Sequence, residues 1–254
     1  MGVNPKLLRR SSLFAELPAA EVNALAELAS MRWFDRGECL FRQGDEIEAL
    51  YVVFDGAIKL SRVTPAGRTM VVDFRGPGQV VGGRAVVGQS SHGDDAHALE
   101  DVLAAVIPLD ASLRFLVSRP AVIMALARYL SWRLESREEK AAGLATKRVH
   151  QRLADGLLEL GRGLGVAVDG VTVINARFTQ AEIADWIGTT RETTSTLLNG
   201  LRRAGHIDIV GRRIHLLNPR AIELYAELEG PPGDLASLAE AASGTREREL
   251  VRSA

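Results

Sequence analysis

The sequence predicts an α+β protein with a β barrel of jelly-roll type, a long helix, and a C-terminal helical domain that ends in a β hairpin. Three observations carry this prediction. Short apolar runs separated by glycines fill residues 31–108, a helical pattern continues from 120 to 145, and two short helices precede a hairpin within 178–217. Turn signals spaced about 8–12 residues apart are typical of sandwiches and jelly rolls.

The composition is that of a soluble globular protein. The chain has 254 residues, of which 46% are hydrophobic and 25% charged, so it can form two domains with buried cores. No apolar run reaches the roughly 18 residues of a membrane span. The first residues, MGVNPKLLRR, lack the apolar core of a signal peptide. We therefore expect a cytoplasmic protein without a membrane partner.

Cysteine content and charge exclude several classes of function. Cys39 is the single cysteine, which excludes an internal disulfide, a Cys-ligated iron–sulfur cluster and a Cys-rich zinc site. The net charge is −1, yet residues 146–220 hold 11 Lys and Arg against 7 Asp and Glu, a balance of +4. A basic module within an acidic chain fits a nucleic-acid partner. The sequence shows no nucleophile–base pair, metal-ligand cluster or P-loop, so we expect neither an enzyme nor a metal protein.

The first domain is expected over residues 1–119. Apolar residues at helical spacing in 11–30, with Pro18 near the start, predict a helix. The runs that predict barrel strands are Cys39–Phe41, Leu50–Phe54, Ala57–Leu60, Met70–Phe74 and Val102–Ile107.

A long helix over 120–145 is predicted to form a dimer seam. Charged residues flank its apolar stripe in the manner of a coiled coil, although Arg137 interrupts it. The alternative is a core helix that covers the barrel. The seam residues are Ile123, Leu126, Leu130, Leu134 and Leu144.

Two further helices have the layout of a helix-turn-helix. Thr179 and Glu182 form a capping box for the first, Gly188 suits the turn, and Thr190 caps a second helix from Arg191 to about Arg203. An ordinary helical hairpin is the alternative. Two β-branched runs around Gly211-Arg212-Arg213 follow directly, however, and a hairpin at this place is typical of a DNA-binding wing.

The outward residues at the start of the second helix predict contacts with double-stranded DNA. Arg191 can contact guanine with two hydrogen bonds, and Glu192 can accept one from cytosine. Further candidates for base, phosphate or peripheral contacts are Thr179, Gln180, Thr190, Ser195, Thr196, Arg202, Arg203, Arg212 and Arg213. We expect this domain over 146–228, preceded by a helix from Val149 to about Gly161 and a Gly-rich segment, 161–170. The tail, 229–254, is expected to be peripheral or disordered.

The order of these elements resembles one family over roughly residues 13–225. It is the bacterial cyclic-AMP receptor protein / fumarate-nitrate regulator (CRP/FNR) family of transcription factors. The stretches that carry the resemblance are Phe14-Ala15-Glu16-Leu17, Gly44-Asp45 before Leu50-Tyr51-Val52-Val53, Gly56, Gly67-Arg68, Pro77-Gly78, Ala98-Leu99-Glu100-Asp101 and Thr190-Arg191-Glu192-Thr193. The resemblance implies a cyclic-nucleotide-binding-type barrel, a dimerisation helix, a winged helix-turn-helix, a homodimer on near-palindromic DNA, and RNA polymerase as a partner.

The sensor half departs from the cyclic-AMP binders of the family. Their phosphate cassette has Gly-Glu and later Arg before Ser or Thr, whereas this chain has Gly82-Gly83 and His92-Gly93. Their adenine-contacting Thr-Ser pair aligns with Arg137-Glu138. Because the carboxylate for the ribose and the guanidinium for the phosphate are missing, we expect that cyclic AMP is not the effector.

The sequence leaves three alternatives for the signal that the sensor half receives. Arg84 or Arg137 can meet another anionic ligand, such as the cyclic di-GMP that relatives use. Both can equally be solvated or ion-paired surface residues. A regulator controlled only by its own abundance is the third alternative. The candidate effector residues are Gly82, Gly83, Arg84, Ala85, His92, Gly93, Arg137 and Glu138. Of the histidines, we expect His92 and His97 to be surface residues rather than haem or metal ligands.

The DNA-reading half departs from the family at one contact. Readers of TGTGA-type half-sites present Arg-Glu followed, four residues after the Glu, by a second Arg, and Thr196 occupies that place here. Thr can touch a base edge or a thymine methyl but cannot form two hydrogen bonds with guanine. We expect a related half-site in which one G·C requirement is relaxed. Target promoters, and activation versus repression, do not follow from the sequence.

Overall fold

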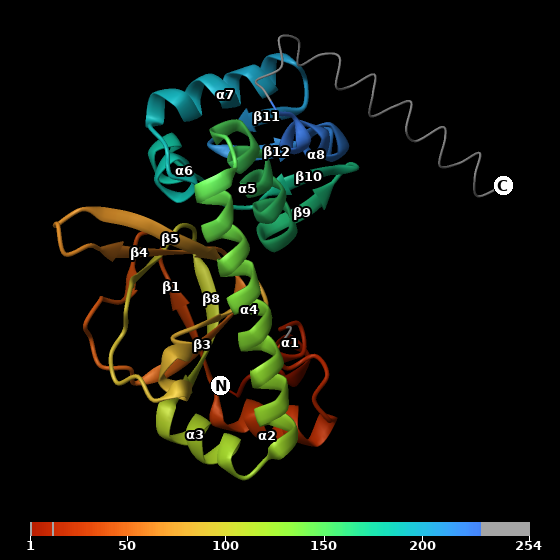
Figure 1. Ribbon diagram of the computed structural model, residues 1–254. Helices are drawn as coiled ribbons and strands as arrows, with labels where there is room; N and C mark the ends of the chain where they lie inside the picture. The colour runs from red at the N-terminus through yellow and green to blue at the C-terminus, as the bar shows by residue number, and fades with distance from the viewer. Residues whose placement is uncertain (1, 12, 230–254) are drawn as a thin grey trace. The chain divides into compact units, whose positions relative to one another are not determined.

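The computed structural model describes residues 2–11 and 13–229, and the predicted tail lies, apart from Glu229, outside the described residues (Figure 1). The chain divides into two compact units, Met1–Glu139 and Lys140–Ala254. Within the described residues, no helix is long and apolar enough to cross a membrane.

The first unit contains helices that surround two β-sheets. Its helices before and after the sheets are α1 (Pro5–Leu8), α2 (Ala19–Leu28), α3 (Leu109–Val117) and α4 (Pro120–Thr146), the last of which continues into the second unit. Its strands are β1 (Ser30–Phe34), β2 (Cys39–Phe41), β3 (Ala49–Asp55), β4 (Ile58–Val63), β5 (Thr69–Arg75), β6 (Val80–Val81), β7 (Asp95–Ala98) and β8 (Val102–Pro108), with the 3₁₀ helix η1 (Gly83–Val87) after β6.

The eight strands confirm the predicted barrel of jelly-roll type. They form two antiparallel four-stranded sheets in the orders β1-β8-β3-β6 and β2-β7-β4-β5. Strand β3 shows why its apolar run is continuous. Leu50, Val52 and Phe54 pack with the helices, whereas Tyr51 and Val53 point into the barrel, so successive side chains are buried on opposite faces.

Two helices of this unit differ from the expectation. The apolar spacing of 11–30 yields a helix only from Ala19, because Pro18 stands at its N-cap and residues 13–16 form a turn. Helix α3 directly follows β8 and was not predicted. It buries Phe115 against the same core as α2.

The part of α4 that belongs to the first unit has two apolar faces. Val122, Ala125 and Tyr129 are buried against the barrel, as the alternative of a covering helix required. Ile123 and Leu134 are 45% and 58% exposed, so they remain available to another surface. Of the predicted seam, Leu126 and Leu130 are half-buried and also pack on the barrel core.

The second unit combines helices with a single four-stranded sheet. After α4 it contains α5 (Val149–Leu164), β9 (Gly165–Val168), β10 (Val171–Ile174), α6 (Gln180–Ile187), α7 (Arg191–Arg203), β11 (Ile207–Val210), β12 (Arg213–Leu216) and α8 (Pro219–Glu227). The sheet order is β11-β12-β10-β9. The predicted hairpin, β11–β12, is therefore part of a larger sheet. The segment 161–170 is not a loop, since it ends α5 and forms β9, and α8 was not predicted.

Candidate DNA-binding surface and effector pocket

Side-chain caps fix both helices of the helix-turn-helix. The Thr179 hydroxyl accepts from the Glu182 backbone N–H at 3.1 Å, and the Thr179 backbone N–H donates to the Glu182 carboxylate at 2.9 Å, which completes the predicted capping box. Thr190 accepts from the Thr193 N–H at 3.2 Å. Gly188 has φ +69°, a left-handed conformation that glycine adopts without strain. These local interactions place the start of α7 at Arg191, where the sequence predicts it.

Arg191 and Glu192 are exposed at the first turn of α7, and neither side chain has a hydrogen-bond or ion-pair partner among the described residues. Helix α7 is anchored on its other face by Leu198 and Leu201, which are buried. The two side chains that the sequence assigns to base reading are thus presented on a fixed helix and are not engaged elsewhere. Because a recognition helix reads bases through its N-terminal residues, their placement suits that role.

Several other candidate contacts are engaged within the protein. The Thr196 hydroxyl donates to the Glu192 carbonyl at 3.0 Å, and Arg202 forms an ion pair with Asp208 at 3.0 Å. The Arg203 Nε reaches the Asn199 carbonyl at 3.4 Å. Ser195 is half-buried, and Gln180 begins α6. An Arg that already has an acidic partner gains less from a phosphate, so Arg202 is a weaker candidate than Arg191.

The wing turn presents Arg212 in an uncommon backbone conformation. Gly211 and Arg212 have φ +57° and +68° between the paired residues Val210 and Arg213, which is the pattern of a type I′ two-residue turn. Arg212 is exposed, whereas Arg213 is half-buried in β12. The Phe178 N–H donates to the Arg212 carbonyl at 3.1 Å and holds the turn. A side chain other than glycine at positive φ costs energy and is often functional.

Thr194 is buried in α7, and its hydroxyl has no hydrogen-bond partner among the described residues. We expect Thr194→Val to raise the free energy of unfolding by about 1 kcal/mol, since valine has the same shape and removes an unsatisfied buried polar group. Urea denaturation measures the change. Thr193→Val is the matched control, because it removes a hydroxyl that lies 3.1 Å from the Thr190 hydroxyl and should not stabilise. A loss of stability in Thr194→Val would contradict the expectation.

Arg152 of α5 joins the end of α4 to the turn of the helix-turn-helix. Its Nη1 donates to the Lys147 carbonyl at 2.7 Å, its Nε to the Ile187 carbonyl at 2.8 Å, and its Nη2 to the Gly188 carbonyl at 3.0 Å. The carbonyls at the end of α6 thereby gain a cationic partner, which stabilises a helix C-terminus. This role of Arg152 was not predicted, because nothing in the spacing of the sequence points to carbonyl acceptors 35 residues away.

The last turns of α4 also pack on α6. The Lys140 ammonium lies 4.0 Å from the centroid of the Trp186 ring, a cation–π geometry. Leu144, which the sequence assigns to the dimer seam, stands 2.9 Å from where a Cβ at Gly188 would lie. The Leu144 side chain can move away from this position, so the preference for glycine at residue 188 comes from its positive φ.

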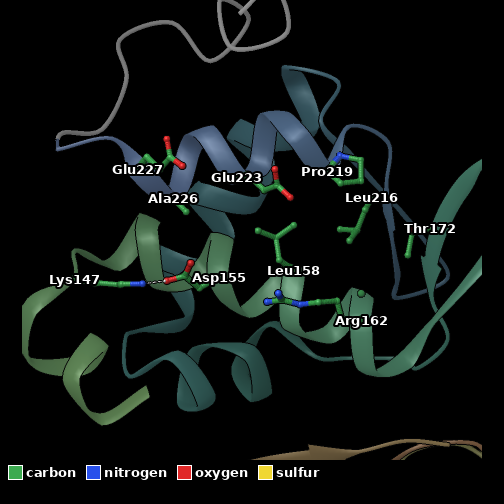
Figure 2. Close-up of a pocket in the computed structure, with 11 residues that line it drawn as sticks. Lys147, Asp155, Leu158, Arg162, Thr172, Leu216, Pro219, Glu223, Ala226 and Glu227 are labelled. Carbon is green, nitrogen blue, oxygen red and sulfur yellow. Dashed lines mark hydrogen bonds and ion pairs between the residues drawn. The ribbon is translucent and has the colours of Figure 1, made fainter. Parts of the chain in front are cut away.

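A hollow of about 480 Å³ lies beside α5 and α8 (Figure 2). Leu158 and Arg162 of α5 face Glu223 of α8, and the ion pair of Lys147 with Asp155, 2.7 Å long, lies at one edge. Its lining carries charges of both signs without an excess of basic residues. This surface does not have the chemistry of an anion site, and no pattern in the sequence predicted it.

The barrel holds a second pocket, of about 460 Å³, that brings together most of the predicted effector residues. Gly82, Gly83, Arg84, His92, Gly93 and Arg137 line it. Ala85 is buried but does not line it, and Glu138 is exposed outside it. Three further arginines, missed by the sequence analysis, also line it: Arg62, Arg75 and Arg133. Asp94, paired with Arg62 at 2.7 Å, is the one acidic residue among the described lining residues.

Arg84 occupies the space that a side chain at residue 93 would take. A Cβ at Gly93 would lie 1.6 Å from the Arg84 Nη1, so the guanidinium packs directly on this glycine. The arrangement brings a positive charge into the pocket from η1, a direction different from that of the missing cassette arginine.

His92 is not the surface residue that the sequence analysis expected. Its side chain is 5% exposed and stacks on Phe41, with ring centroids 3.5 Å apart and planes 8° from parallel. Burial is the main cause that lowers the pKa of His92, and Arg84 adds to it, whereas Asp45 opposes it. These effects together favour the neutral form of the His92 ring. His97 is half-buried in β7, and the described residues contain no group of three metal-ligating side chains.

Comparisons with known proteins agree with this organisation. The cyclic nucleotide-binding domain family matches residues 31–119, and the Crp-like helix-turn-helix domain family matches residues 151–225. The CRP-like cAMP-activated global transcriptional regulator of Mycobacterium tuberculosis is 27% identical over 209 residues, 82% of this chain and 93% of that protein. The global nitrogen regulator of Synechococcus elongatus is 33% identical over 192 residues, 74% of this chain and 86% of that protein. The structure of FixK2 from Bradyrhizobium japonicum superposes with a TM-score of 0.69 at 25% identity, and covers 80% of this chain and 99% of that one.

Proposed function

This chain belongs to the CRP/FNR family of transcription regulators, and we propose that it acts as a homodimer on a near-palindromic DNA site. The family's members are regulators rather than enzymes. The observation that carries the proposal is the exposure of Arg191 and Glu192 at the N-terminal turn of α7, without partners in the described chain. Side chains in this place can form base-specific hydrogen bonds in a major groove.

The geometry of DNA supports a dimer. One recognition helix spans about half a helical turn, so specific binding usually requires two half-sites roughly 34 Å apart. The outward face of α4 offers apolar side chains for a two-fold contact, since Ile123 and Leu134 are about half exposed. An exposed apolar stripe on a helix is stabilised by a second copy of the same stripe. We propose RNA polymerase as the further partner of the DNA-bound dimer.

We further propose that cyclic AMP does not gate this regulator, although the mycobacterial relative is named as cAMP-activated. The reason is chemical. Gly83 stands in place of the cassette glutamate and His92 in place of the cassette arginine, so they supply neither the carboxylate nor the guanidinium that cyclic-AMP binders provide. The arginine-lined pocket favours gating by another anionic effector, with cyclic di-GMP as one candidate, over control by abundance alone.

Selection of bound sequences from random DNA, with and without 100 μM cyclic AMP or cyclic di-GMP, tests these proposals. We expect a two-fold symmetric site that is enriched equally with and without cyclic AMP. Binding that depends on salt but shows no preference over random competitor DNA would instead indicate an architectural DNA-binding protein. Specific binding that tightens with micromolar cyclic AMP would refute the proposal on gating.

A further inference from the structure

We propose that the barrel pocket binds a small organic anion whose acidic group lies between Arg75 of β5 and Arg133 of α4. This inference rests on the proposed role of the first unit as a sensor. It differs from the cyclic-nucleotide expectation in place, because the acid would be held on the side of α4 and β5 and not by the loop that contains Gly83 and His92.

The first argument is an excess of positive charge. The Arg75 side chain is 4% exposed and the Arg133 side chain 17% exposed, and both guanidinium groups contact the same oxygen of Asp73. The distances from the Asp73 Oδ2 are 2.7 Å to Arg75 and 3.5 Å to Arg133. Two poorly solvated cations thus share one carboxylate oxygen. A buried charge normally has a full partner, so this arrangement leaves room for a second anion.

The electrostatics of Arg133 agree with this view. Burial is the main cause that lowers the pKa of Arg133, and the neighbouring Arg75 and Arg137 lower it further. Asp73 and Tyr129 only partly offset these effects. An anion between the two guanidinium groups would relieve both the repulsion and the lost solvation.

A second, independent observation is the hydroxyl of Tyr129. This side chain is 9% exposed and lines the same pocket one helical turn before Arg133. Its hydroxyl is buried and has no hydrogen-bond partner among the described residues. Buried hydroxyl groups are normally hydrogen-bonded, and a ligand in the pocket would supply the missing acceptor.

The rest of the lining indicates the body of the ligand. Leu60, Val80, Val81 and Leu130 line the pocket together with the arginines. A volume of about 460 Å³ is in the range of sites for organic ligands and far exceeds what an inorganic ion fills. The chemistry therefore fits an acid with an apolar or aromatic body.

Two fluorescent probes distinguish the contribution of the acidic group to binding from that of the apolar body. The anion 8-anilinonaphthalene-1-sulfonate and the neutral N-phenyl-1-naphthylamine share the same aromatic body and differ in the sulfonate. We expect full-length protein to bind the anion at least tenfold more tightly than the neutral probe at one site per chain. Arg133→Gln should abolish this preference and leave the neutral probe unchanged, because a hydrogen bond to a charged group contributes a factor of roughly ten or more. Arg128→Gln, which changes an exposed arginine on the same helix, is the matched control.

Asp73→Asn provides a test of opposite sign. It removes the internal carboxylate that competes for Arg75 and Arg133, so the anionic probe should bind several-fold more tightly than to the wild type. Thermal melting without probe shows whether each variant is folded, and Arg133→Lys replaces Arg133→Gln if the latter is not. Equal binding of the two probes by the wild type, or an unchanged preference in the Arg133 variant, would overturn the inference. Specific DNA binding by the same variants, measured without probe, reports separately on the proposed function.

Discussion

Replacing Arg191 by alanine should weaken binding to the selected DNA site by about 1–3 kcal/mol, roughly 5- to 150-fold, and relax the preference at one base position of each half-site. The expectation follows from the first turn of α7, where Arg191 is exposed and has no partner among the described residues. The substitution removes an exposed side chain that has no hydrogen bond or ion pair among the described residues, so the free energy of unfolding should stay within about 0.5 kcal/mol of the wild type. Competition binding with single-base variants of the site measures both effects.

Arg212→Gln is the matched comparison. Arg212 is exposed at the wing turn, where a phosphate contact is expected. Its loss should weaken all sequences alike and reduce the salt dependence of binding by about one phosphate contact. If Arg191→Ala changed all sequences alike, or left affinity and footprint intact, Arg191 would not read a base.

Replacing Arg152 by methionine should lower the free energy of unfolding of the second unit by about 2–3 kcal/mol. The guanidinium donates hydrogen bonds to three carbonyls. The hydrogen bonds to the Lys147 and Gly188 carbonyls are exposed, so water can replace them. The bond to the Ile187 carbonyl is part-buried and accounts for most of the loss. Methionine keeps the packing of the apolar stem, so the change reports on the hydrogen bonds rather than on lost volume.

Urea denaturation followed by the fluorescence of Trp186, with Trp33 and Trp132 replaced by phenylalanine, measures this effect in the second unit. Arg162→Met changes an exposed arginine on the same helix and should alter stability by no more than about 0.5 kcal/mol. Arg152→Lys should be intermediate, because an ammonium cannot reach three carbonyls in the fork geometry of a guanidinium. Equal stability of Arg152→Met and Arg162→Met would show that water fully replaces the guanidinium.

Sequence reasoning succeeded where local chemistry determines structure. The capping box of Thr179 and Glu182, the turn at Gly188 and the hairpin at Gly211 each depend on residues within a few positions of one another. It failed for β9, because four glycines within 161–170 indicate a loop and the strand residues are all exposed. Helix α8 has a start signal in Asn218-Pro219, an N-cap residue followed by proline, which a search for apolar periodicity alone does not detect.

The candidate pocket could be predicted only in part, because only some of its residues lie close together in the sequence. Gly82, Arg84 and His92 come from one loop region, and the resemblance to known cassettes directs attention there. Arg75 and Arg133 are about 60 residues apart and meet only through Asp73, within the packing of α4 on the barrel. A contact of this kind leaves no pattern in the spacing of either segment.

The pairing of β10 with β12 has a consequence for the order in which the second unit folds. Thr172 faces Leu216 and Val173 faces His215, so both helices of the helix-turn-helix lie inside the loop that this pairing closes. Closing a loop of this length has an entropic cost. The contacts between β10 and β12 offset this cost only once the two strands have paired. Helix α7 and the sheet should therefore open in one cooperative step. Amide hydrogen exchange of Leu198 and Ile214 should then proceed with the same opening free energy, and the reading helix should gain its order together with the strands that enclose it.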